Sequence, residues 1–113
     1  MQIPSKTYKV KAQSVSEHSI YFTIVGEDTV KWMFVNSKEM ESFQWIIALM
    51  TSYSKQLKAG IAVEDIINDM KNTFQPHGSY FLEDGSGREV NSIVHHLGLV
   101  LEQHALDSKL KEI

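Results

Sequence analysis

The segment SIYFTIVGEDTVKWMFV, residues 19–35, decides the fold of the first third of the chain. Apolar side chains alternate with other residues on both sides of a polar turn, GEDT. Such alternation is typical of antiparallel strands that bury one face. The side chains expected on that buried face are Ile20, Phe22, Ile24, Val30, Trp32 and Phe34. The segment therefore predicts a β-hairpin.

A further strand is predicted upstream, in KTYKVKAQ, residues 6–13. Tyr8 and Val10 alternate there with Lys9 and Lys11, which is the period of a strand with one face in water. Together with the hairpin, this strand predicts an antiparallel three-stranded meander.

Two amphipathic helices are predicted after the meander, in residues 36–60 and 62–74. In both segments apolar side chains recur every three to four positions, the period of a helix with one buried face. The first stripe comprises Met40, Phe43, Ile46, Ile47, Met50, Tyr53 and Leu57. The second comprises Val63, Ile66, Ile67, Met70 and Phe74.

The ends of these helices carry local signals. Asn36 or Ser37 is expected to cap the start of the first helix, and Gly60 to end it. Pro76 and Gly78 are expected to stop the second helix.

The stretch SYFLEDGSGREVNSI, residues 79–93, is predicted to form a short hairpin that leads into a third helix capped by Asn91 or Ser92. The stripe of that helix comprises Ile93, Val94, Leu97, Val100, Leu101, Ala105 and Leu106. The charged end of the chain is expected to fray from about residue 107. The element order predicts one α+β domain, residues 1–113: a meander, two helices, a short hairpin and a C-terminal helix, packed in two layers.

Composition excludes several classes of function. The formal net charge is -3, so we expect no partner DNA or RNA. There is no run of about eighteen apolar residues and no secretion signal, so we expect a cytoplasmic protein without a membrane partner. The chain has no cysteine, which excludes disulfides, a thiolate nucleophile and cysteine-ligated zinc.

The hairpin stretch contains the parts of an anion site. Gly85 and Gly87 allow backbone N–H groups to face outward, and Arg88, the one arginine, can pair with a phosphate. The helix that starts after Asn91 adds further amides, and Tyr80 and Phe81 offer flat faces for a base. In the alternative interpretation the glycines only turn a hairpin, Arg88 pairs with a neighbouring Glu83 or Glu89, and Asn91 only caps.

Acidic residues around this turn oppose an anion, so additional positive charge is needed. Lys9 and Lys11 share one face of the first strand and are candidates to supply it, from the same subunit or from a neighbour. The alternative is that they are edge-strand lysines that discourage aggregation.

The remaining candidates for metal binding or catalysis have little support in the sequence. His95, His96 and His104 fall on the third helix without the one-turn spacing of a metal pair, so we expect surface or interface histidines and no metal. The carboxylates Glu64, Asp65 and Asp69 fall off the apolar stripe and indicate a solvated acidic face. No serine lies in a nucleophile pattern. We therefore predict no catalytic residues, no cofactor and no enzymatic activity.

Three segments carry a family resemblance: FVNSKEMESFQWI, EDIINDMKNTFQPHGSYF and VNSIVHHLGLVLEQH. The chain, from about Tyr8 to His104, resembles the small C-terminal module of adenosylcobalamin-dependent (class II) ribonucleotide reductases. It is also similar to free-standing phage anti-Thoeris proteins that sequester cyclic ADP-ribose signals. In that second group an aromatic residue and an asparagine ten positions later contact the ligand, a relation that Phe81 and Asn91 match.

The resemblance implies a nucleotide-related binding module. Its first implied function is non-enzymatic sequestration of a cyclic nucleotide-derived small molecule, in pockets at the interfaces of a homo-oligomer. The second is an accessory module of a split reductase, since the large catalytic barrel and a cysteine pair are both absent from this sequence. Trp45, beside the stripe of the first helix, is expected either in the core or at a subunit contact.

Overall fold

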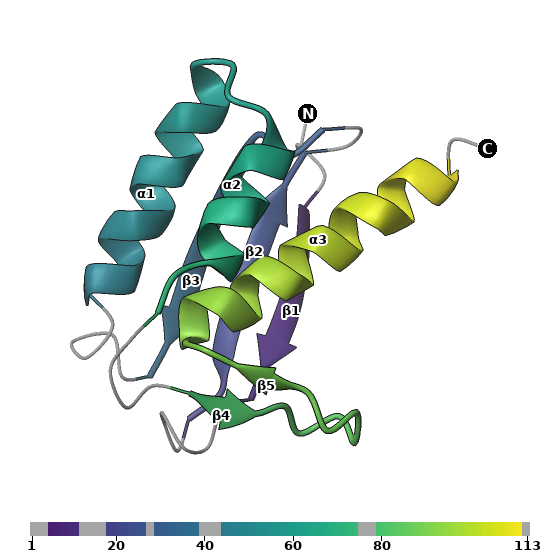
Figure 1. The fold of residues 1–113 in the computed structure, drawn as a ribbon. Helices are drawn as coiled ribbons and strands as arrows, with labels where there is room; N and C mark the ends of the chain where they lie inside the picture. The colour runs from purple at the N-terminus through teal and green to yellow at the C-terminus, as the bar shows by residue number, and fades with distance from the viewer. Residues whose placement is uncertain (1–4, 12–17, 27–28, 39–43, 75–78, 112–113) are drawn as a thin grey trace.

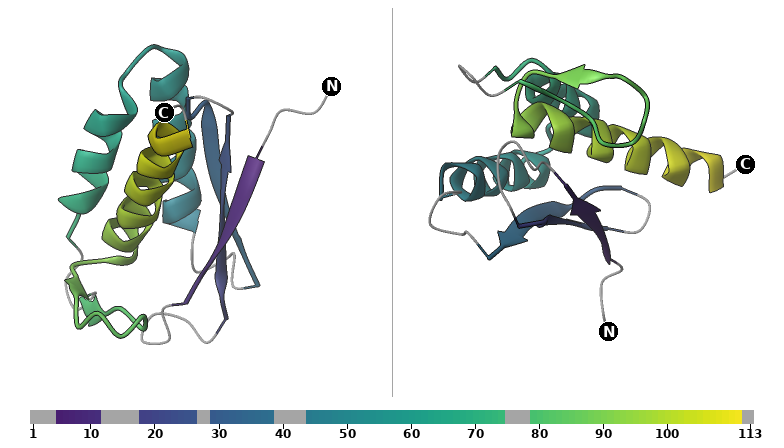
Figure 2. Two further views of the ribbon diagram at one scale, coloured as in Figure 1. Left: turned by 90° about the vertical axis from the view of Figure 1, so that its right-hand side faces the viewer. Right: turned by 90° about the horizontal axis from the view of Figure 1, so that it is seen from below.

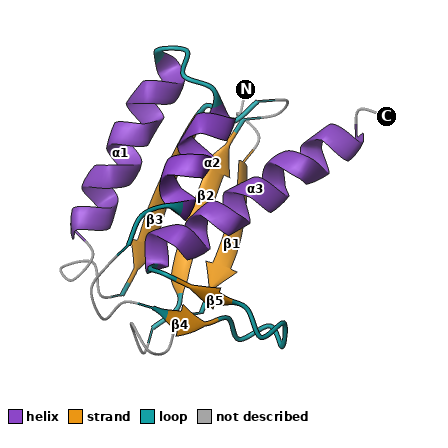
Figure 3. Cartoon of the chain, viewed as in Figure 1, coloured by secondary structure: helices purple, strands orange, loops and turns teal. Residues whose placement is uncertain are grey.

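The computed structural model describes residues 5–11, 18–26, 29–38, 44–74 and 79–111. It confirms the α+β class, with a sheet in one layer and helices in the other (Figures 1 and 3). The elements are β1 (Ser5–Val10), β2 (Ile20–Val25), β3 (Trp32–Ser37), α1 (Gln44–Lys58), α2 (Val63–Lys71), β4 (Tyr80–Phe81), β5 (Glu89–Val90) and α3 (Ile93–Lys111).

The main sheet is the predicted antiparallel meander, in the order β1-β2-β3. All the helices lie on one face of this sheet, as the side view in Figure 2 shows. Phe22, in the central strand, pairs with Tyr8 of β1 and Val35 of β3, so these three side chains point toward the helices. This face holds the core of the molecule, because Phe22 has no exposed surface and Val35 is buried.

The prediction of which face of β3 is buried was wrong. Met33 and Val35 are the buried apolar residues of this strand, whereas Phe34 is 46% exposed and Trp32 is half-buried. Met33 pairs with Ile24, so the buried face of β2 continues into Met33 and Val35. Both alternating sets of β3 are largely apolar, and a shift of one residue exchanges the two faces of a strand.

Helix α1 covers the free edge of β3. Ile46, Met50 and Tyr53 are buried against the core, as predicted. The buried Ser54 hydroxyl accepts a hydrogen bond from the Met33 backbone N–H and donates one to the Met33 carbonyl, each at 3.0 Å. The backbone groups of an edge strand need hydrogen-bond partners. At Met33 the Ser54 hydroxyl makes the bonds that a further strand would otherwise make.

The predicted start of the first helix was wrong. Asn36 and Ser37 belong to β3, and the described part of α1 begins at Gln44. Met40 and Phe43, predicted on its stripe, lie outside the described residues. The glycine signal at the other end is confirmed, because Gly60 follows α1 with a positive φ of 99°.

Helices α2 and α3 pack closely on one another. A Cβ atom added at Gly98 of α3 would lie only 2.9 Å from Cβ of Met70 in α2. Ile66, Ile67 and Met70 are buried as predicted. Phe74 and Leu106 were predicted on the buried stripes but are 68% and 50% exposed.

The ends of α2 and α3 explain these two exposed residues. Helix α2 ends at Lys71, before Phe74, and Asn72 follows as its C-cap. The predicted stop residues Pro76 and Gly78 lie outside the described residues. Helix α3 runs to Lys111, past residue 107, so Leu106 lies on a helical segment that extends away from the sheet in Figure 1.

Candidate ligand-binding site

The β4–β5 hairpin is held by its own polar groups. The Leu82 N–H donates to the Arg88 carbonyl at 2.8 Å, and the Ser86 N–H donates to Oδ1 of Asp84 at 2.9 Å. Hydrogen bonding to Ser86, first with its side chain and then with its backbone N–H, lowers the pKa of the Asp84 carboxyl. Gly85 and Gly87 have positive φ values of 81° and 73°, so both set the turn as predicted.

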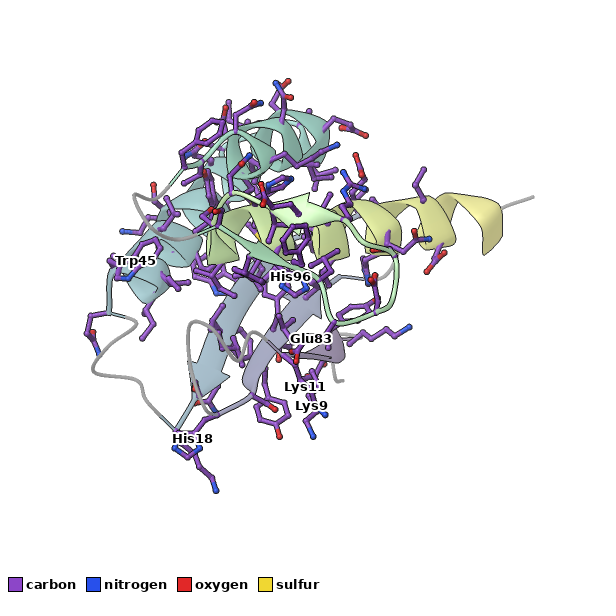
Figure 4. All side chains as sticks on the ribbon, turned by 60° about the horizontal axis from the view of Figure 1, so that its bottom comes forward. Lys9, Lys11, His18, Trp45, Glu83 and His96 are labelled. Atoms are coloured by element: carbon purple, nitrogen blue, oxygen red, sulfur yellow. The ribbon has the colours of Figure 1, made fainter. Side chains whose placement is uncertain are left out.

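A cavity of about 290 Å³ lies between β1, residues 82–84 of the hairpin loop and α3. Its lining consists of Tyr8, Lys9, Val10, Lys11, Leu82, Glu83, Asp84, His96 and Val100. Figure 4 shows the labelled side chains Lys9, Lys11, Glu83 and His96 gathered in this region, with Lys9 and Lys11 coming from β1 and its end. Both predicted lysines thus border the same cavity as Glu83 and Asp84. Strand alternation turns the Lys9 side chain to the face of β1 opposite to Tyr8, away from the helices.

The other predicted ligand contacts do not line this cavity. Phe81 is 64% exposed and pairs with Glu89, so its side chain points to the opposite face of the hairpin from the buried Tyr80. The side chain of Arg88 is exposed. Within the part of the chain that the structure describes, no ion pair joins Arg88 to Glu83 or Glu89. Arg88 is thus available to a ligand.

Ser92 is the cap of α3. Its buried hydroxyl accepts a hydrogen bond from the His95 N–H at 3.0 Å and donates one to the Thr73 carbonyl at 2.6 Å. Asn91 precedes the cap, is half-buried, and uses its backbone N–H to donate to Nδ1 of His95 at 3.0 Å. The Asn91 side chain is therefore not the helix cap.

The histidines of α3 are more buried than the sequence predicted. His95 is only 8% exposed, and burial together with Arg88 and Lys71 lowers its pKa. Nδ1 of His96 lies 2.8 Å from the Tyr80 hydroxyl, and Nδ1 of His104 lies 2.8 Å from the Tyr8 hydroxyl. These two tyrosine–histidine pairs join α3 to β4 and to β1. Sequence reasoning placed His96 and His104 on the third helix but found no partner for either.

The pKa of His96 is lowered mainly by burial. Asp84 and Glu83 act in the opposite direction, and His95 adds to the lowering. The pKa of Tyr80 is raised above its usual range by burial, with a further contribution from Glu83. At neutral pH the pair therefore consists of a protonated phenol and a neutral imidazole.

The remaining candidates are surface features. Glu64, Asp65 and Asp69 are exposed on α2, which confirms the solvated acidic face. A second cavity of about 220 Å³ lies between α2 and α3, beside an ion pair of 2.9 Å between Lys71 and Glu102. Among the described residues, no group of three or more histidine and carboxylate side chains is placed to hold a metal ion.

The fold and the cavity define a small α+β domain with a mixed-charge site between its first strand, its hairpin and its last helix. A family model, the TSCPD domain, matches residues 2–105, and the chain belongs to this family. The TSCPD domain is found in class II ribonucleotide reductases. No curated protein and no solved structure matches the chain. None of the described helices is long and apolar enough to cross a membrane.

Proposed function

We propose that this TSCPD domain is a non-enzymatic phage anti-defence protein that binds and sequesters a cyclic nucleotide-type immune signal of the cyclic ADP-ribose class. The observation that supports the proposal best is the cavity that Lys9 and Lys11 line together with Asp84, the residue before Gly85 of the turn. Two lysines offset the acids that make the hairpin alone a poor anion site.

The proposed mechanism is affinity without turnover. Phe81 would stack on a base, Asn91 would bond to the ribose or the base edge, and Arg88 would pair with a phosphate. The exposure of Phe81 and Arg88 leaves both side chains available for these contacts.

We further propose a homo-oligomer whose subunits complete the pocket. The cavity of about 290 Å³ is at the lower end of the range of ligand pockets, which is roughly 300–1,000 Å³. Phe81 and Arg88 stand outside it, so a ligand that touched all these residues would need another wall. Trp45 is 43% exposed on α1, which favours its alternative role as a subunit contact. Sedimentation velocity with and without ligand tests this point, and a monomer under both conditions would contradict it.

A second function is an accessory module of a split class II ribonucleotide reductase. The observation that favours it is membership of a domain family found in those enzymes. In this case the exposed residues would contact a catalytic partner, and the cavity would take an allosteric nucleotide.

Mass spectrometry of released nucleotides separates these functions. The protein is incubated with a cyclic ADP-ribose pool, washed, heat-denatured, and the supernatant is analysed. Intact signal is the expected result. A degraded product would make the protein an enzyme and overturn sequestration. Absence of any nucleotide, together with a thermal shift from ATP or dATP, would favour the reductase module instead.

A further inference from the structure

The face of the main sheet that is turned away from the helices, its outer face, carries three aromatic side chains. Tyr21 of β2 and Phe34 of β3 point to this face, because their neighbours Phe22 and Val35 are paired and buried on the other. Tyr21 is 42% exposed and Phe34 is 46% exposed. Trp32, two residues before Phe34, points the same way and is half-buried. None of the described helices covers this face (Figure 2).

The three rings are arranged as a stacking surface. Phe34 pairs with Thr23, so Tyr21, two residues before Thr23, is its diagonal neighbour on the outer face. Diagonal neighbours in an antiparallel pair lie about 7–8 Å apart, and residues two apart in one strand lie roughly 6.6 Å apart. Asn36, which pairs with Tyr21, is exposed and offers an amide to the edge of a base. Exposed aromatic rings on neighbouring strands are the surface on which several RNA-binding domains stack two or three bases.

The charges of the chain are segregated between its two layers. Among the described residues, the strands of the main sheet and their flanking residues carry five lysines and no carboxylate, whereas all eight carboxylates fall in residues 64–107. Glu17, Glu27 and Asp28, which fall between the strands in sequence, lie outside the described residues. The expectation of no nucleic-acid partner followed from the net charge of the whole chain, and a segregated charge removes that ground for the sheet layer.

Two lysines flank the aromatic rings. Lys9 pairs with Tyr21, so its side chain stands beside Tyr21 on the outer face. It is exposed, and within the described residues it takes part in no ion pair. At the opposite edge of the sheet, Nζ of Lys58 lies 4.7 Å from the centroid of the Trp32 ring. The acidic hairpin that borders Lys9 across the cavity lies on the helix side of the sheet (Figure 2).

We propose that the outer face of the sheet binds single-stranded nucleic acid, with bases stacked on Tyr21 and Phe34 and phosphates paired with Lys9 and Lys58. Stacking together with phosphate pairing is typical of proteins that bind single strands. A second copy of the chain suits this face less well, because a two-fold contact sets the same cationic patch against itself. The inference does not rest on the proposed function, although both use Lys9.

Fluorescence anisotropy of the full chain with labelled oligo-dT and oligo-rU strands of about twelve nucleotides tests the proposal. Both strands should bind with saturation, and a DNA duplex of the same length should bind more weakly, because its bases are not free to stack. Between about 50 and 200 mM salt, the affinity should fall with a logarithmic slope of about −0.7 for each phosphate neutralised. Tighter binding of oligo-rU would assign the face to RNA, and tighter binding of oligo-dT would assign it to DNA.

Matched variants test the assigned residues. Phe34→Ala should weaken binding of both strands by about tenfold, whereas Phe74→Ala, at an exposed aromatic residue after α2, should leave binding unchanged. Lys9→Ala should reduce the magnitude of the salt slope by about 0.7, and Lys55→Ala, at an exposed lysine of α1, should not change it.

Several results would overturn the proposal. These are no saturable binding by the unmodified protein, equal effects of Phe34→Ala and Phe74→Ala, or tighter binding of the duplex than of the single strands. A dimer that Phe34→Ala converts to a monomer in sedimentation velocity, with no oligonucleotide bound, would make this face a contact between two copies instead.

Competition separates this inference from the proposed function. An excess of cyclic ADP-ribose should not displace the oligonucleotide, because Phe34 and the hairpin lie on opposite sides of the sheet (Figure 2). Displacement would mean that both ligands occupy one site and would overturn the assignment to the outer face. If the single strands bind as expected but no cyclic ADP-ribose is recovered by mass spectrometry, the outer-face site stands and the proposed function fails.

Discussion

At the scale of single residues, Ser92 joins the start of α3 to the segment after α2. Its buried hydroxyl caps the His95 N–H and bonds to the Thr73 carbonyl. Ser92→Ala should lower the free energy of unfolding by about 2 kcal/mol, because it removes a helix cap and leaves a carbonyl without its partner. Urea denaturation measures the change. Ser52→Ala, at an exposed position in α1, is the control and should stay within about 0.5 kcal/mol of the parent.

Arg88 carries a second prediction at this scale. Its side chain is exposed and has no ion pair with Glu83 or Glu89, within the described residues. Arg88→Ala should therefore weaken binding of cyclic ADP-ribose by more than about tenfold while the melting temperature changes little. Calorimetric titration and a thermal melt measure the two effects. Binding as tight as that of the parent would mean that the arginine is only a surface residue.

At the scale of elements, the contact between α2 and α3 depends on Gly98. A Cβ at this position would lie 2.9 Å from Cβ of Met70 and 3.3 Å from the Lys71 backbone nitrogen. Neither atom is the mobile end of a side chain, so one helix must move. Alanine favours a helix over glycine by about 1 kcal/mol, but the overpacking costs about 1–3 kcal/mol.

Gly98→Ala should therefore destabilise the protein by about 1 kcal/mol in urea unfolding, against the helix propensity. Gln103→Ala, at an exposed position of α3, should have a small effect. A Gly98→Ala protein more stable than the parent would show that α3 can shift away from α2 at no cost.

The elements themselves could be predicted from apolar periods and turn residues, whereas some of their faces could not. Ile20, Phe22 and Ile24 stand out in β2 because their face is buried and their pattern is unambiguous. In β3 both alternating sets are apolar, and only pairing with β2 distinguishes Val35 from Phe34. The stripe predicted for the second helix was too long because α2 ends at Lys71.

At the scale of the whole molecule, the candidate site combines contacts that sequence could and could not predict. The need of the acidic hairpin for positive charge pointed to Lys9 and Lys11, and both residues border the same cavity as Glu83. Their contact with a ligand stays a prediction. His96 was missed, because its role depends on a bond to Tyr80, sixteen residues away on another element. The Tyr8–His104 contact spans 96 residues and has no local signal.

The same buried histidines make the stability of the whole molecule depend on pH. The pKa values of His95 and His96 are lowered in the folded state, mainly by burial. An unfolded histidine titrates near pH 6.5, so below about pH 7 the unfolded chain binds more protons than the folded one. The stabilising contribution is present above that pH and is lost as the pH falls through it.

The free energy of unfolding should therefore decrease between pH 7.5 and 5.5, by at most about 1.4 kcal/mol per pH unit for each histidine. Urea denaturation across this range gives the slope. His96→Gln, which keeps a polar side chain but does not titrate, should reduce the slope. An unfolding free energy that is constant or rises toward pH 5.5 would contradict the lowered pKa values of His95 and His96.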